Sequence, residues 1–102
     1  MNTEELNALL ATFAKPENNH IIDRVKLVQY AKKMVNALQD DRTEKYRWLT
    51  VMILLEESES VFLAYSYAYE KLDMIFHSIV PYNMLDSEKY LKFLSIRNKV
   101  TL

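Results

Sequence analysis

Residues 61–80 read VFLAYSYAYEKLDMIFHSIV, and this stretch decides the fold that the sequence predicts. Its apolar residues recur alternately every four and every three positions, at Val61, Tyr65, Ala68, Leu72, Ile75 and Ile79. This spacing puts them on one face of a helix and is typical of the seam of an antiparallel bundle. A second apolar row of Phe62, Tyr69 and Phe76 widens the apolar arc. A helix with so wide an arc must be covered by several neighbours, so we expect residues 61–80 to form the most buried helix.

The first of three upstream helices is predicted from about Thr3 to Ala14. Its start resembles a capping box, in which Asn2 takes the place of serine or threonine and Glu5 follows three residues later. The apolar residues of the segment repeat with helical spacing, at Leu6, Leu9, Leu10 and Phe13. Pro16 and the polar residues 17–19 are expected to form a linker.

The second helix is predicted from about His20 to Gln39, and four lysines and arginines leave it net positive. A third helix follows Asp41, which forms another box-like start with Glu44, and reaches about Leu55. The polar residues 56–60 contain no glycine or proline, so one long bent helix across this junction stays open as an alternative.

A short fifth helix is predicted after the break at Pro81, with Asp86 as its cap and residues 87–98 as its body. No segment shows the alternating pattern of a strand. The sequence therefore predicts an all-α fold, an antiparallel four-helix bundle with a short fifth C-terminal helix, formed by residues 1–102 as a single domain.

The composition excludes several function classes. The chain has 102 residues, no glycine, no cysteine and a net charge of −1. Phosphate-binding loops, dinucleotide fingerprints and nucleophile elbows depend on glycine, so we expect no enzymatic activity. The near-neutral charge gives no general attraction for nucleic acid. The lack of cysteine and the acidic N-terminus, which does not resemble a signal peptide, favour a cytoplasmic location.

One group of side chains has metal-ligating or acid–base chemistry. Glu70, Asp73 and His77 are spaced so that they share one face of the predicted helix. Carboxylate-bridged metal bundles need a second helix with a Glu-x-x-His pair, which the sequence lacks. We therefore interpret these three residues as a solvated stripe and expect no metal and no cofactor.

Tyrosines alternate at positions 65, 67 and 69. Because residues two positions apart point away from each other on a helix, at least one of these rings should leave the buried seam. Tyr67 is the ring that does not fit the seam. Most of the tyrosines are expected in the core, and a groove for a partner's helix or peptide is the functional alternative.

The most polarised segment runs from Lys89 to Leu102 and contains no acidic residue. Its basic residues are Lys89, Lys92, Arg97 and Lys99, and these are the predicted partner-binding residues. An amphipathic basic helix can bind a membrane face, nucleic acid or an acidic protein surface. A docking helix with a merely solvated basic face is the structural alternative.

The order and composition of the segments resemble a known family. The stretches that carry the resemblance are NTEELNALLATF, HIIDRVKLVQYAKKMVNALQ, TEKYRWLTVMILLEE, VFLAYSYAYEKLDMIFHSIV and DSEKYLKFLSIRNKVTL. Together they are similar to the small immunity proteins for pediocin-like (class IIa) bacteriocins, the enterocin A immunity-like group. The resemblance implies a cytosolic, non-enzymatic helical bundle that protects the producer cell. It further implies contact with a membrane sugar-transporter–bacteriocin complex through the C-terminal region.

Two other classes stay open. A small DNA-binding regulator could use residues 87–98 as a recognition helix, although the overall acidity counts against nucleic acid. A dimeric adaptor could use spare apolar surface as its interface, for example at Tyr46, Trp48 or Tyr67.

Overall fold

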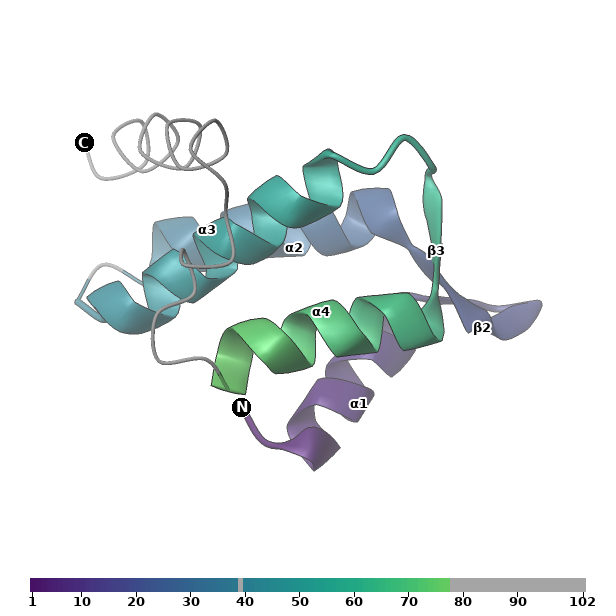
Figure 1. The fold of residues 1–102 in the computed structure, drawn as a ribbon, viewed down its shortest axis with the longest axis horizontal. Helices are drawn as coiled ribbons and strands as arrows, with labels where there is room; N and C mark the ends of the chain where they lie inside the picture. The colour runs from purple at the N-terminus through teal and green to yellow at the C-terminus, as the bar shows by residue number, and fades with distance from the viewer. Residues whose placement is uncertain (39, 78–102) are drawn as a thin grey trace.

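The structure, a computed structural model, describes residues 1–38 and 40–77. In Figure 1 the helices form two neighbouring pairs, and a small sheet lies at one end of both. One pair is α2 with α3, and the other is α1 with α4, which also contacts α3. The elements follow in the order α1 (Thr3–Thr12), β1 (Ala14–Lys15), β2 (Asn18–Asp23), α2 (Arg24–Ala37), α3 (Arg42–Glu56), β3 (Phe62–Ala64) and α4 (Tyr65–His77).

The predicted all-α four-helix bundle is wrong, because the described residues contain a three-stranded antiparallel sheet in the order β1-β2-β3. The architecture is a mixed α/β arrangement. Two of the predicted helices begin too early, since residues 20–23 belong to β2 and residues 62–64 form β3 instead of first helical turns. The predicted fifth helix, residues 87–98, lies outside the described residues.

The N-terminal helix α1 agrees with the sequence in its start and its buried face. The Asn2 side chain accepts a hydrogen bond from the Glu5 backbone amide at 2.8 Å, which confirms the predicted cap. Leu6 and Leu10 are fully buried, so the predicted apolar stripe is also confirmed.

The predicted linker after α1 is a β-hairpin. Lys15 pairs with Asn18, so Pro16 and Glu17 form a two-residue turn, and proline presets the φ angle for such a turn. The register of the two strands shifts between this pair and the pair of Ala14 with Ile22. Within this irregular stretch, the Asn18 side chain accepts a hydrogen bond from the His20 backbone amide at 3.0 Å. Proline and asparagine, which indicate the end of a helix, here turn the chain into β2.

The transition from β2 to α2 takes place at Asp23. The side chain of Asp23 accepts a hydrogen bond from the Lys26 amide at 3.2 Å and so caps α2. The preceding Ile21 and Ile22 are β-branched and suit a strand. The helix therefore begins at Arg24, after the strand, and not at His20 as predicted.

The sheet has one buried and one outer face. Ile22 pairs with Leu63, and both side chains are buried against the helices. Side chains alternate along a strand, so the next pair, Asp23 and Phe62, belongs to the outer face. Ala64, two residues after Phe62, belongs to the same face. The outer face carries the surface described below.

Arg24 joins three segments at the start of α2. Its backbone amide donates to the Val61 carbonyl at 2.9 Å. Its guanidinium donates to the Leu55 carbonyl at 3.3 Å, at the end of α3, and also to the Ser60 carbonyl. The Ser60 hydroxyl in turn donates to the Phe62 carbonyl at 2.6 Å and accepts from the Phe62 amide at 3.2 Å. These bonds fix the connection between α3 and β3.

We expect Arg24→Ala to lower the free energy of unfolding by about 1–3 kcal/mol, because the part-buried Leu55 carbonyl and the exposed Ser60 carbonyl lose a charged donor. Chemical denaturation measures this loss. Arg24→Lys is the control, since it keeps the charge but not the two-pronged contact, and it should recover only part of the stability. Full recovery in Arg24→Lys would contradict the geometric role.

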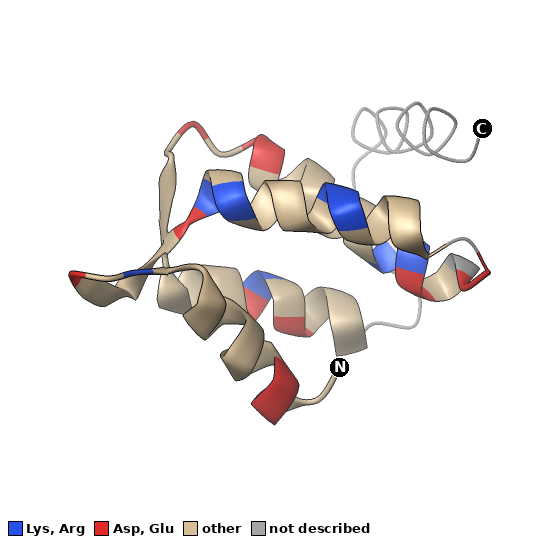
Figure 2. Ribbon diagram, turned by 180° about the vertical axis from the view of Figure 1, so that it is seen from behind, with Lys and Arg blue, Asp and Glu red and all other residues tan. Residues whose placement is uncertain are grey.

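The Lys and Arg residues run along α2 without an acidic residue between Arg24 and Ala37 (Figure 2).

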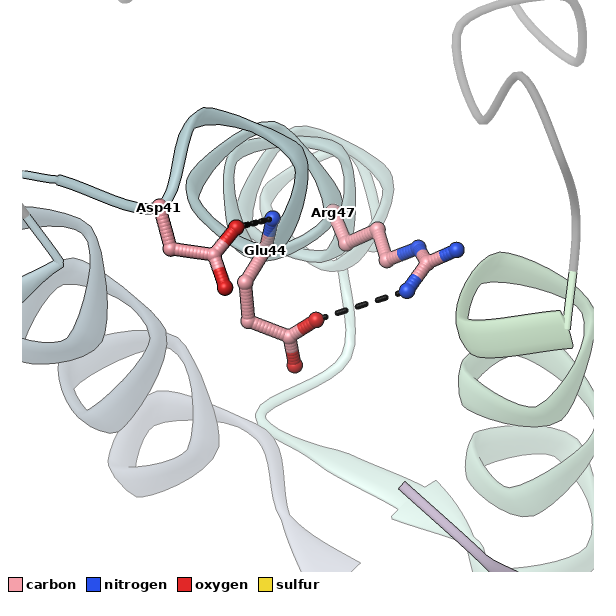
Figure 3. Close-up of polar contacts among 3 residues, drawn as sticks. All are labelled: Asp41, Glu44 and Arg47. Carbon is pink, nitrogen blue, oxygen red and sulfur yellow. Dashed lines mark hydrogen bonds and ion pairs between the residues drawn. The ribbon is translucent and has the colours of Figure 1, made fainter.

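The adjoining α3 begins with a cap that the sequence predicted. The Asp41 carboxylate accepts from the Glu44 amide at 3.0 Å, and the Glu44 carboxylate pairs with Arg47 at 3.4 Å (Figure 3).

The most buried helix is α3, not the segment 61–80. Its fully or nearly buried residues from the middle to the end are Trp48, Leu49, Thr50, Val51, Met52, Ile53 and Leu55. The predicted seam of α4 is confirmed at Ala68, Leu72 and Ile75, which are all fully buried. Val61 leaves the seam and is 49% exposed, because β3 separates it from α4. Since β3 lies between α3 and α4, these are two helices and not one bent helix.

Candidate binding surface

The four predicted partner-binding residues, Lys89, Lys92, Arg97 and Lys99, lie outside the described residues. The candidate surface in the described part of the chain lies on the outer face of the sheet. It is a pocket of about 210 Å³, which we call the sheet-face pocket. Its lining comes from the end of α1, the β1–β2 hairpin, the start of α2 and β3, namely Thr12, Phe13, Ala14, Lys15, Pro16, Glu17, Asp23, Lys26 and Phe62.

Lys15 connects the two edges of this pocket. Its ammonium lies 4.0 Å from the centroid of the Phe62 ring and 3.1 Å from the Glu17 carboxylate. A cation over an aromatic face at an exposed site contributes about 0.5–1 kcal/mol. These contacts hold Phe62 in place across β2, although the residue is 41% exposed. The pocket therefore has an aromatic wall that is partly open to solvent and already oriented.

The carboxylate of Glu17 is the partner of Lys15 at the hairpin turn. A backbone hydrogen bond and the Lys15 ammonium lower the pKa of the Glu17 carboxyl below its ordinary value of 4.5. Because the pKa is lower in the folded state than in the unfolded state, the ionised carboxylate stabilises the fold at every pH above the unfolded-state pKa. This contribution is lost as the pH falls below 4.5 and through the folded-state pKa.

We expect NMR titration of the Glu17 carboxyl to give a midpoint below 4.5 in the wild-type protein. In Lys15→Ala the midpoint should rise towards 4.5 without reaching it, because the backbone hydrogen bond remains. Equal midpoints in the two proteins would show that Lys15 does not act on Glu17.

A further part of the pocket lining is formed where β2 passes into α2. The Asp23 carboxylate is used as the cap of α2 through the Lys26 amide. The exposed Lys26 side chain makes no ion pair with the other residues of the described ranges. The pocket thus combines aromatic surface with two carboxylates and two ammonium groups, and only one ammonium, that of Lys15, is bound by a neighbour.

The candidate metal or acid–base residues on α4 do not converge. Asp73 pairs with His77 at 2.8 Å, and both side chains are substantially exposed. Within residues 1–38 and 40–77, no three histidine, aspartate or glutamate side chains lie close enough together to hold a metal ion. Glu70 is exposed on the same helix and does not complete such a group.

The prediction for Tyr67 is confirmed. Tyr67 is 40% exposed, whereas Tyr65 and Tyr69 stack on each other with a centroid distance of 6.3 Å and are half-buried. The Lys71 ammonium lies 5.5 Å from the centroid of the Tyr67 ring. Met74, one heptad further along α4, is 42% exposed. This exposed stripe is separate from the sheet-face pocket, whose residues come from other elements.

Sequence reasoning missed the pocket because its residues come from segments that local periodicity keeps apart. The helical spacing predicts Phe62 in an apolar row of a helix, and Pro16 and Glu17 are expected in a linker that follows a helix ending near Ala14. One signal was present in the sequence. Asp23 follows two isoleucines and precedes a run with helical spacing, which is the position of a cap.

The chain matches no protein-family model, no curated protein and no solved structure. The resemblance to the bacteriocin immunity proteins therefore stays a prediction. Of the helices in the described part of the chain, none has the length and apolar character needed to cross a membrane.

Proposed function

We propose that the chain is a non-enzymatic binding protein that contacts another protein at the sheet-face pocket. The observation that carries the proposal is the exposure of Phe62 at 41% on a strand whose position is fixed by Arg24 and Ser60. The preceding Val61 is 49% exposed, so two consecutive apolar residues are exposed where the chain enters β3. Aromatic residues that are held in place and surrounded by polar groups are typical of binding hot spots.

The size of the pocket supports a protein partner over a small molecule. Sites for drug-sized ligands have volumes of about 300–1,000 Å³, whereas this pocket has about 210 Å³. A single side chain of a partner would fill it, and the surrounding charges of Lys15, Glu17, Asp23 and Lys26 would form the polar rim.

The edge strand itself is a poor site for adding a partner's strand. Both backbone groups of Phe62 are hydrogen-bonded to the Ser60 hydroxyl. Occupying these groups disfavours pairing with another chain at Phe62. The proposed contact therefore uses side chains of the outer face and not main-chain pairing.

A photocrosslinking experiment tests the proposal. With p-benzoylphenylalanine at position 61, the full-length protein should crosslink to one defined protein in its native cells, whereas the same group at the exposed position 8 on α1 should not. For the isolated partner, Phe62→Ala should weaken binding about tenfold or more. The matched control is Tyr67→Ala, which removes an equally exposed ring from α4 and should bind normally. Equal affinities of the two variants would refute the proposed site.

A more specific role is immunity against a bacteriocin. It is supported by the sequence resemblance and by the basic segment from Lys89 to Leu102. In this role the partner is a membrane sugar-transporter–bacteriocin complex, and the exposed charges mainly guide association. The four-helix bundle that the resemblance implied is not the fold of the described residues, so this role rests on the sequence alone.

A protection assay tests the immunity role. Reversal of Lys89, Lys92 and Lys99 to glutamate should abolish protection of bacteriocin-sensitive cells and leave the thermal midpoint nearly unchanged, because exposed charges add little to stability. Unimpaired protection by the folded triple variant would reject this surface. If the wild-type protein protects against none of a broad panel of bacteriocins, the immunity role fails. Salt-dependent binding to a defined DNA site would instead favour a regulator, and a concentration-dependent dimer would favour an adaptor.

A further inference from the structure

The outer face of α2 has an unusual charge distribution. The helix contains Arg24 and three lysines but no acidic residue. Arg24 is bound to the carbonyl groups of α3 and the following connection, so it belongs to the fold. Apart from Val25 and Ala37, the exposed side chains that remain are basic or neutral polar, and we call the group of Lys26, Gln29, Lys32, Lys33 and Asn36 the α2 outer face.

The helical spacing places these residues on one continuous surface. At about 100° per residue, all five fall within an arc of about 120°, and Lys26 and Lys33 lie about 10.5 Å apart along the helix axis. Lys32 pairs with Glu56 of α3 at 3.0 Å, so one of the three charges is already matched. Lys26 and Lys33 make no ion pair with any other described residue. In Figure 2, α2 is seen from the side opposite to that of Figure 1, with its Lys and Arg positions in blue.

The α2 outer face is continuous with the sheet-face pocket, because Lys26 belongs to both. At the same end of α2, Val25 is 39% exposed, and Val61 is tied to the neighbouring Arg24 by a backbone hydrogen bond. The combined surface therefore begins with exposed apolar side chains and continues with unmatched positive charge.

We propose that the partner presents an acidic segment, which lies along the α2 outer face while an apolar side chain next to it occupies the sheet-face pocket. This inference rests on the proposed protein-binding function and adds the chemistry of the partner. Aspartate or glutamate side chains of the segment pair with Lys26 and Lys33, while Gln29 between these lysines and Asn36 beyond Lys33 supply hydrogen-bonding groups. Complementary charge of this kind fixes the direction of the segment and speeds association.

An acidic protein segment fits this surface better than nucleic acid. The exposed Val25 and Phe62 give an apolar end that a phosphate backbone cannot use. The carboxylates of Asp23 and Glu56 border the lysines and would repel a regular row of phosphates. A peptide can place its acidic side chains only where the lysines are.

Synthetic peptides of one length test the inference with the full-length protein. The first carries a phenylalanine followed by glutamates, and two matched peptides carry glutamines or lysines in place of the glutamates. At low salt the glutamate peptide should bind about tenfold more tightly than the glutamine peptide, and the lysine peptide should bind least. The preference should disappear at about 1 M salt, where charges are screened within about 3 Å.

Variants locate the effect. The double reversal of Lys26 and Lys33 to glutamate should abolish the preference for the glutamate peptide, and Lys33→Glu alone should reduce it. Lys71→Glu on α4 is the control for the single reversal and should leave the preference unchanged. Each variant should keep the thermal midpoint of the wild type. An equal affinity for all three peptides, or a preference that survives the double reversal, would overturn the inference.

Two further arms separate the alternatives. Phe62→Ala should weaken all three peptides by the same factor, and unchanged affinities in this variant would refute the pocket and hence the proposed function itself. If the peptides depend on Phe62 but not on their charge, the proposed function stands and only the acidic partner is wrong. A DNA duplex that binds more tightly than the glutamate peptide, with the same dependence on Lys26 and Lys33, would assign the α2 outer face to nucleic acid instead.

Discussion

Replacement of Trp48 with alanine is expected to lower the free energy of unfolding by about 3–5 kcal/mol. Trp48 lies on α3, is 1% exposed and is among the largest fully buried side chains of the described residues. Its ring contacts Tyr30 of α2 at 5.4 Å and Phe76 of α4 at 4.9 Å, both in edge-on geometry. Removing it would leave a cavity where three helices meet, and aromatic pairs of this geometry add about 0.5–1.5 kcal/mol each.

Chemical denaturation followed by circular dichroism measures this effect without depending on tryptophan fluorescence. Trp48→Phe is the matched control, because it keeps an aromatic ring between Tyr30 and Phe76. The indole N–H of Trp48 has no acceptor among the described residues, so the phenylalanine variant loses no hydrogen bond there. We expect it to lose less than half as much stability as the alanine variant. A loss below about 1 kcal/mol in Trp48→Ala would show that the helices do not depend on this side chain.

The helices could be predicted from the sequence because each one is defined by nearby residues. The caps at Asn2 and Asp41 need only a residue three positions further along, and the structure confirms both. The seam through Ala68, Leu72 and Ile75 is equally local. Periodicity of this kind indicates which residues of a helix are buried, and it does so without knowledge of the helix's neighbours.

The sheet could not be predicted in the same way. Ile22 of β2 pairs with Leu63 of β3. Neither segment alternates between apolar and polar residues over enough positions to indicate a strand. The apolar run from Val61 fits a helix as well as a strand when it is considered alone. What decides between them is the pairing with a segment about forty residues earlier and the Arg24 and Ser60 contacts at the connection. Tertiary contacts of this kind override local preference.

The candidate surface, like the fold, could be predicted only in the part that depends on residues close together in the sequence. The positive charge of the second predicted helix follows directly from its lysines, and the structure shows on which face Lys26 and Lys33 lie. The pocket depends on Lys15 and Phe62, which are separated along the chain and meet across β2. A surface that joins one helix to three strands is visible only once the strands are known.

Replacement of Leu72 with alanine is the second large expected effect, at about 2–5 kcal/mol. Leu72 is fully buried on α4, which packs against α1, α3 and β2. Its removal therefore weakens the contact of α4 with both the helices and the sheet, while α2 and α3 keep their own interface. The residue occupies the centre of the predicted seam, and its burial is one feature of the sequence-based interpretation that does not depend on the fold class.

The size of the loss depends on how far the surrounding side chains collapse into the cavity. Leu72→Met conserves most of the volume and should cost less than about 1.5 kcal/mol. Met74→Ala on the exposed side of α4 is the second control and should change stability by less than about 0.5 kcal/mol, because that side chain is 42% exposed. Denaturation of the three variants under one condition gives the comparison. If Leu72→Ala and Met74→Ala lost equal stability, α4 would not be packed on the core through the face that both the sequence and the structure assign to it.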